Sequence, residues 1–193
     1  MKVAVYSGSF NPLHIGHLAI IRHLIDEAGF DRVYLIVSPK NPLKDSISAA
    51  SGHDRYNAAV AAVDRHFGQT TSCGKNSAVK VDDIELNMPE PHYTIRTLDA
   101  LSKREPENSF TLTIGADNLA GFRHWRDYQR ILKEYGIAVF PRTGFDLESI
   151  KAELLQEDPD YRINLLKAEM VDISSTTIRE ALKSGKDISG WLM

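Results

Sequence analysis

Two histidines and a run of small residues stand where the first apolar segment of the chain gives way to helical spacing. Residues 7–17 read SGSFNPLHIGH and follow directly on the run Val3 to Tyr6. Small residues and a proline let the backbone approach a ligand closely, and the first N–H groups of a helix are free to bind an anion. His14 and His17 are three residues apart, so both imidazoles can face the same phosphate. The segment therefore predicts a phosphate site rather than a plain turn with two surface histidines.

Other known motifs do not account for this segment. It is neither a Walker sequence nor the dinucleotide pattern G-x-G-x-x-G. A zinc site would need a third ligand, and the nearby sequence offers no plausible cysteine or glutamate partner for the two histidines.

Two lysines follow the second apolar run. Lys40 and Lys44 lie in the proline-containing stretch SPKNPLK, residues 38–44. Lysine is a compact charge that suits phosphate, although from this stretch alone a solvated loop with ordinary surface lysines is about as plausible. Its place after a strand, at the same sheet edge as the histidines, favours phosphate binding.

A third segment rich in hydroxyl groups lies near the end of the chain. The four residues 174–177 (SSTT) open an amphipathic helix, and Arg179 lies on the same helix face as Ser175 and Thr176. The alternative is an ordinary capped helix, because Thr177 and Glu180 have the capping-box spacing. Capping uses one of the four hydroxyls and does not need the arginine, so a second anion site is predicted.

The elements that must position these segments alternate between strand and helix. Short runs rich in β-branched and aromatic residues predict strands at 3–6, 33–37, 110–114 and 136–140, with further candidates at 79–86 and 163–168. Helical spacing occurs at 18–25, 56–63, 95–101 and 178–182, whereas 69–77 and 146–160 are expected to be polar and charged connections. The alternation predicts an α/β fold, a Rossmann-like parallel sheet with helices on both faces. Loops at the carboxyl ends of its strands then form one edge, where such folds bind ligands.

Composition limits the possible partners. The chain has 193 residues, 42% of them hydrophobic and 25% charged, which predicts a single globular domain over residues 1–193. Its net charge is -3, so no overall positive field draws it to nucleic acid or to anionic lipid. The single cysteine, Cys73, favours a reducing compartment, and the apolar runs are too short for a signal peptide or a membrane span. We expect a cytoplasmic protein that binds neither nucleic acid nor membrane.

These residues together resemble a known group of enzymes. The stretches 8–17 and 173–179 are similar to the paired signatures of the HxGH nucleotidyltransferase superfamily. Further resemblance to the bacterial nicotinate-nucleotide adenylyltransferases lies in the stretches 38–44, 93–98, 114–119 and 122–125, so it covers most of the chain. Ser9 and Asn11 stand where the family often has threonine and aspartate, and both keep a hydrogen-bonding side chain.

The resemblance implies a nucleotidyltransferase-type fold and adenylyl transfer from ATP to nicotinate mononucleotide, which gives deamido-NAD and pyrophosphate. It implies a catalytic group of His14, His17, Lys44 and Arg179. It implies ATP binding by Gly8, Ser9, Phe10, Gly16, Ser174, Ser175 and Thr176. It implies acceptor binding by Lys40, Tyr93, Thr94, Asp117, Trp125 and Arg142. Mg²⁺ is expected to be bound mainly through the ATP phosphates, because the sequence shows no dedicated carboxylate cage.

Several alternatives stay open. From spacing alone Trp125 is more readily a core residue, Asp117 could cap a helix, and Arg142 could be an exposed loop arginine. Nicotinamide mononucleotide is an alternative acceptor, since a few backbone hydrogen bonds separate the acid from the amide. A non-catalytic nucleotide sensor of the same fold is disfavoured, because all four expected catalytic residues are present. A homo-oligomer is possible, and the sequence gives no sign of the number of copies.

Overall fold

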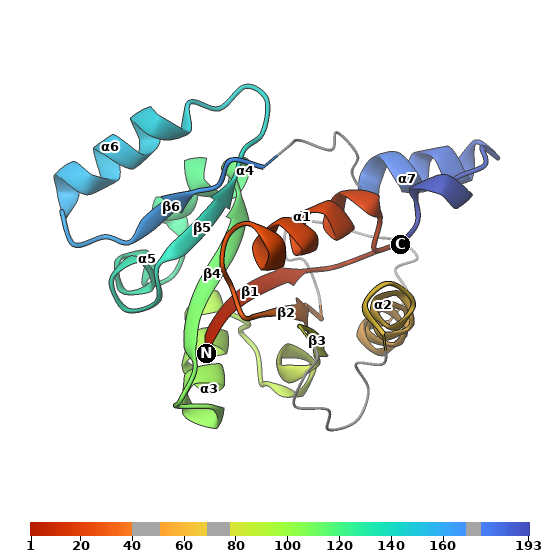
Figure 1. Cartoon of the computed structure of the whole chain (residues 1–193), viewed down its shortest axis with the longest axis horizontal. Helices are drawn as coiled ribbons and strands as arrows, with labels where there is room; N and C mark the ends of the chain where they lie inside the picture. Colours follow the sequence, from red (N-terminus) through yellow and green to blue (C-terminus); the bar gives the residue numbers. More distant parts are fainter. Residues whose placement is uncertain (40–50, 69–77, 169–174) are drawn as a thin grey trace.

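The computed structural model describes residues 1–39, 51–68, 78–168 and 175–193. Within these residues the strands form a six-stranded sheet in the order β3-β2-β1-β4-β5-β6, in which every neighbouring pair is parallel (Figure 1). Its strands are β1 (Lys2–Gly8), β2 (Arg32–Val37), β3 (Val79–Asp82), β4 (Ser109–Gly115), β5 (Ile137–Phe140) and β6 (Ile163–Leu165). The predicted Rossmann-like parallel sheet is therefore confirmed.

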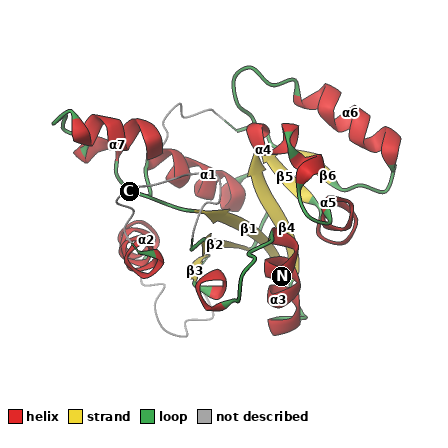
Figure 2. Cartoon of the chain, turned by 180° about the vertical axis from the view of Figure 1, so that it is seen from behind, coloured by secondary structure: helices red, strands yellow, loops and turns green. Residues whose placement is uncertain are grey.

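Helices surround the strands, as Figure 2 shows from behind. The α-helices are α1 (Ile15–Asp26), α2 (Gly52–Phe67), α3 (Thr94–Arg104), α4 (Ala116–Ala120), α5 (Tyr128–Arg130), α6 (Leu147–Glu157) and α7 (Ser175–Lys183). Short 3-10 turns lie at η1 (Ile84–Asn87), η2 (Phe122–His124) and η4 (Ser189–Trp191), and η3 (Ile131–Tyr135) is a π-helical turn. Along the described residues, no helix is both long and apolar enough to span a membrane.

The sheet has a separate apolar core on each face. Successive residues of a strand point to opposite faces, so Val3 and Val5 belong to one cluster and Ala4 to the other. The first cluster includes Leu98 of α3, and the second includes Ile21 of α1. Because the strands are buried on both faces, their sequences are nearly continuous apolar runs and do not alternate between apolar and polar residues.

Three of the sequence predictions need correction. The candidate strand 163–168 ends at Leu165. The run 79–86 is a strand only as far as Asp82, whose carboxylate accepts a hydrogen bond from the N–H of Ile84 (3.1 Å) and turns the chain into η1. The stretch 146–160 is not merely a connection, because it contains α6, capped by Asp146, which accepts from the N–H of Ser149 (3.1 Å). Leu154 is the one fully buried residue of α6, and Leu147, Ile150 and Leu155 pack against the same core cluster, so its apolar residues do recur at helical spacing. The connection expected at 69–77, with Cys73, lies outside the described residues.

The strand order fixes where a ligand can bind. From β1 the chain moves to β2 and β3 on one side, and β4, β5 and β6 follow on the other. The loops after β1 and β4 therefore leave the sheet in opposite directions, and open α/β folds bind ligands in the crevice between two such loops.

Candidate active site

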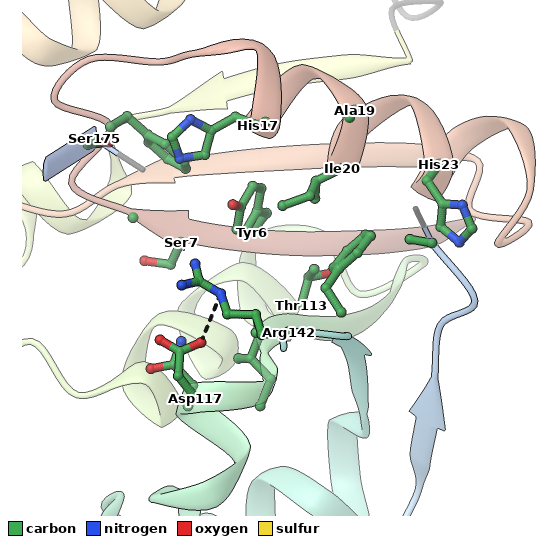
Figure 3. Close-up of a pocket in the computed structure, with 18 of the residues that line it drawn as sticks. Tyr6, Ser7, His17, Ala19, Ile20, His23, Thr113, Asp117, Arg142 and Ser175 are labelled. Carbon is green, nitrogen blue, oxygen red and sulfur yellow. Dashed lines mark ion pairs between the residues drawn. The ribbon is translucent and has the colours of Figure 1, made fainter. Parts of the chain in front are cut away.

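A cleft of about 1440 Å³ lies at this edge of the sheet. It is larger than the roughly 300–1,000 Å³ of a typical single-ligand site. Figure 3 shows His17 on one side of it, with Arg142 and Asp117 on the facing side. The predicted residues that line it are Gly8, Ser9, Phe10, His14, Gly16, His17, Thr94, Asp117, Trp125, Arg142, Ser175 and Thr176.

The two histidines meet at the start of α1. Their rings lie face to face, with centroids 3.7 Å apart and planes tilted by 38°. His14 is 5% exposed, and its backbone N–H donates to Nδ1 of His17 (3.2 Å). A ring nitrogen that accepts a hydrogen bond carries no proton, so the proton of neutral His17 sits on Nε2, which is left as a donor.

Both imidazoles are held in the neutral form. Burial lowers the pKa of His14 to about 4, and the positive charge of Arg142 adds to the effect. Burial lowers the pKa of His17 to about 3, with further contributions from His14 and Arg142. Near neutral pH the pair therefore offers hydrogen bonds rather than positive charge.

Aromatic packing shapes the loop between β1 and α1. Phe10 is 4% exposed and makes edge-to-face contacts with the rings of Tyr6 (5.5 Å) and His17 (5.3 Å). A Cβ at Gly8 would lie 3.0 Å from Cε1 of Phe10, which explains the glycine. Phe10 itself has φ +42°, a left-handed conformation that non-glycine residues rarely adopt.

Helix α7 is bound directly to this loop. Ser175 Oγ donates to the carbonyl oxygen of Pro12 (3.2 Å), and Arg179 Nη1 donates to that of Asn11 (2.9 Å). Arg179 Nη2 also donates to Oγ1 of Thr176 (3.0 Å). The structure thus brings the two predicted anion sites together. The Arg179 side chain binds the loop and does not line the cleft.

An ion pair forms the facing wall. Arg142, just after β5, places Nε 3.3 Å from Oδ1 of Asp117, at the start of α4. Gly115 allows this approach, because a Cβ there would lie 2.6 Å from the same Oδ1. Both side chains are about half exposed, so solvent weakens the pair and a ligand can compete for either partner.

Trp125 and the start of α3 line the cleft beside this pair. Trp125 packs against the apolar core and the ring of Phe122 (5.0 Å), yet it remains partly exposed to the cleft. Thr94, the first residue of α3, also faces the cleft, whereas Tyr93 is 44% exposed and does not line it. The predicted residues Lys40, Lys44 and Ser174 lie outside the described residues.

The structure adds a buried polar chain that the sequence analysis missed. Ser38 Oγ donates to Glu85 Oε2 (2.7 Å), so Ser7 Oγ is the donor in its own contact with Ser38 Oγ (3.0 Å). Thr97 Oγ1 donates to the other oxygen of Glu85 (2.8 Å). His92 also lines the cleft, with a buried Nδ1 that has no hydrogen-bond partner. The position of Ser7 and Ser38 at strand ends was a usable signal, but nothing local marks Glu85 or His92.

Comparison with known proteins identifies the family. A model described as cytidylyltransferase-like matches residues 5–181. The "Probable nicotinate-nucleotide adenylyltransferase" of Flavobacterium johnsoniae is 35% identical over 188 residues, which is 97% of this chain and 90% of that protein. The protein of the same name from Bacteroides fragilis is 37% identical over 191 residues, 99% of this chain and 87% of that protein. The chain belongs to the cytidylyltransferase-like family, among its nicotinate-nucleotide adenylyltransferases.

A solved structure extends this result to the fold. The nicotinic acid mononucleotide adenylyltransferase of Plasmodium falciparum, complexed with NaAD, superposes with a TM-score of 0.75 at 20% identity, over 99% of this chain and 90% of that one. At that identity the likeness concerns the fold of this cytidylyltransferase-like chain, and it agrees with the parallel sheet described above.

Proposed function

We propose that this chain transfers the adenylyl group of ATP to the phosphate of nicotinate mononucleotide. An oxygen of the acceptor phosphate forms a bond to the α-phosphorus of ATP, and the bond from that phosphorus to the bridging oxygen of the β-phosphate breaks. Pyrophosphate leaves with the electron pair, and the other product is deamido-NAD. No side chain forms a covalent bond in this scheme, so the protein acts by positioning and by stabilising charge.

The observation that carries the proposal is the junction of α1 and α7 at one loop. Ser175 and Arg179 bind the carbonyls of Pro12 and Asn11, so two helix starts share one end of the cleft with His17. Helix starts attract anions, and two together suit the phosphate chain of a nucleotide. The names of the curated relatives give the same reaction.

His17 is assigned the α-phosphate. Its Nε2–H is a neutral donor fixed by the N–H of His14, and charge that develops on the phosphoryl oxygens in the transition state strengthens such a bond. Lys44 and Arg179 are proposed to offset the charge of the leaving pyrophosphate. For Arg179 this requires a change from its present contacts with Asn11 and Thr176.

Mg²⁺ is proposed to accompany ATP. In the described ranges no group of three or more histidine, cysteine or carboxylate side chains converges on a point. No three of the carboxylates that line the cleft (Asp26, Glu27, Glu85 and Asp117) and its histidines come together, which fits an ion held mainly by phosphate oxygens and water. When bound, the ion neutralises part of the phosphate charge.

The acceptor is assigned to the facing wall of the cleft. Trp125 offers a partly exposed ring for stacking on the pyridine, and Thr94 begins a helix whose first N–H groups can meet a carboxylate. Arg142 has a charge suited to the acceptor phosphate, and Asp117 can accept from a ribose hydroxyl. The cytoplasmic location and a homo-oligomer remain predictions.

Pyrophosphate release tests the function. Purified protein is mixed with ATP and Mg²⁺, and nicotinate mononucleotide or nicotinamide mononucleotide is added over a range of concentrations. We expect release with the acid, at a kcat/KM far above that of the amide, and none after chelation of Mg²⁺. Equal rates with both acceptors would contradict the carboxylate site at Thr94. Folded protein that binds ATP without turnover would instead indicate the sensor.

A further inference from the structure

Arg55 of α2 connects two loops of the cleft although it lies outside both predicted signatures. It is 5% exposed. Its Nη1 donates to the carbonyl oxygen of Ser9 (2.6 Å), and its Nη2 donates to that of Pro39 (2.7 Å). Ser9 belongs to the loop after β1, and Pro39 follows the end of β2. One guanidinium therefore joins two neighbouring strand ends.

The bond to Ser9 acts at a strained point of the chain. The next residue is Phe10, whose φ of +42° is disfavoured for any residue with a side chain. Such a conformation persists where the surrounding structure holds it in place. Arg55 fixes the peptide on one side of Phe10, and the rings of Tyr6 and His17 pack against its side chain.

The start of α2 is itself held firmly against these loops. Ser51 caps the helix by accepting from the N–H of Asp54 (3.1 Å). A Cβ at Gly52 would lie 2.7 Å from Leu86 and 3.6 Å from the Cα of Pro39, so the helix start is in close contact with the loop after β2. Arg55, one turn further on, is thereby placed within reach of both carbonyls.

We propose that Arg55 is a positioning residue for the nucleotide phosphates, acting through the backbone of Ser9 and Pro39. A planar guanidinium presents several donors in a fixed fork and can join two carbonyls at once, whereas a lysine ammonium is a single centre. Burying a charged group is costly unless it is well hydrogen-bonded, and both of these bonds go to loops of the site. The inference rests on the proposed function and on the expectation, from the family resemblance, that Ser9, which lines the cleft, binds ATP.

The test compares Arg55→Lys and Arg55→Ala with matched changes at Arg104. Arg104 is a structural control, since its guanidinium binds the buried carboxylate of Asp82 (Nη1 to Oδ1, 3.1 Å) and it does not line the cleft. For each protein we would measure kcat, the KM of both substrates, the Kd of ATP by calorimetry, and Tm. Rates are corrected for the folded fraction.

We expect Arg55→Lys to raise the KM for ATP and to lower kcat, each by about tenfold, because a shift of about 1 Å at a reacting group can cost about 100-fold in rate. The acceptor KM should change less than the KM for ATP, because the bonds of Arg55 to Ser9 and Pro39 do not involve Trp125 or Thr94. Guanidinium ion at millimolar concentration should restore part of the activity of Arg55→Ala, and sodium chloride at the same concentration should not. The Arg104 variants should lose Tm but keep both KM values.

Other outcomes would overturn the inference. If the Arg55 variants lose activity only in proportion to their folded fraction, with the KM for ATP unchanged, the arginine merely stabilises the fold. If Arg55→Ala does not fold, the KM for ATP and the kcat of Arg55→Lys alone test the inference. If the wild-type protein shows no turnover, the proposed function fails. In that case the Kd of ATP still tests the role of Arg55. Equal affinity for ATP in wild type and Arg55→Lys would contradict a role of Arg55 in positioning the phosphates.

Discussion

His17→Ala should reduce the rate of pyrophosphate release far more than it weakens the binding of either substrate. The structure leaves His17 with one free donor, Nε2–H, because Nδ1 accepts from the N–H of His14. Loss of one donor that serves the transition state costs about 100- to 1,000-fold in kcat, or roughly 2.7–4 kcal/mol. We expect kcat to fall by that factor, with both KM values changing much less.

The magnitude depends on His17 being neutral. With its pKa lowered to about 3 by burial, His17 is almost entirely neutral in the folded protein at pH 7. Its contribution is therefore that of a hydrogen bond and not of a full charge. NMR titration of the free protein checks this directly, since the ring signals of His14 and His17 should stay constant as the pH falls from 8 to about 5.5, above both lowered pKa values.

Steady-state kinetics of His17→Ala and of His66→Ala supply the assay and its control, since His66 is exposed on α2 and away from the cleft. Two results would refute the reasoning. A His17→Ala enzyme with normal kcat and a raised KM for ATP would place the histidine in ground-state binding. A His17 ring that titrates near 6.5 in the free protein would mean that burial does not keep it neutral.

Three further predictions concern the facing wall and the acid stability of the site. Trp125→Ala should raise the acceptor KM with a smaller effect on kcat, as kinetics with nicotinate mononucleotide would show, whereas a loss of roughly 3–5 kcal/mol in unfolding free energy would assign the ring to the core. Gly115→Ala places a Cβ 2.6 Å from Oδ1 of Asp117 and should disturb its pairing with Arg142. We expect a raised acceptor KM with little change in Tm, because an exposed pair contributes less than about 1 kcal/mol, and a large fall in Tm would contradict this. The pKa of His14 is about 4 in the folded protein and 6.5 in the unfolded chain, so between these pH values the unfolded chain binds more protons. The stability present at pH 7.5 is therefore lost as the pH falls below about 6.5. Urea unfolding should show a loss of about 2 kcal/mol from this ring between pH 7.5 and 5, and His14→Gln should reduce that loss; an identical pH dependence in the variant would count against the shift.

The sequence was informative where function and local structure share one stretch of chain. The histidine pair was predicted as a pair because three residues separate its members on a helix, and the structure places their rings 3.7 Å apart. The four clear strands were predicted because each is buried on both faces and so reads as an apolar run. Helix α6 was missed although Leu147, Ile150, Leu154 and Leu155 have helical spacing, because the many charged residues of 146–160 are also typical of a connection.

Contacts between distant segments could not be predicted. Arg55 reaches Ser9, 46 positions away, and Arg179 reaches Asn11, 168 positions away, and both donate to backbone carbonyls that every residue type carries. The side chain of the accepting residue takes no part in such a bond, so the sequence gives no sign of it. The strand order has the same limit, because apolar runs predict strands but do not show that β1 lies between β2 and β4.

These distant contacts explain how a loop of backbone carbonyls can face an anion. Carbonyl oxygens carry partial negative charge and would repel phosphate. In the loop after β1, three of them accept hydrogen bonds, from Arg55 at Ser9, from Arg179 at Asn11, and from Ser175 at Pro12. Two of these donors are guanidinium groups, so the bonds that fix the loop also bring positive charge to it. With both histidines neutral, these two arginines are the cations that the described structure places on the loop itself. The proposed phosphate site would therefore depend on groups outside the histidine motif.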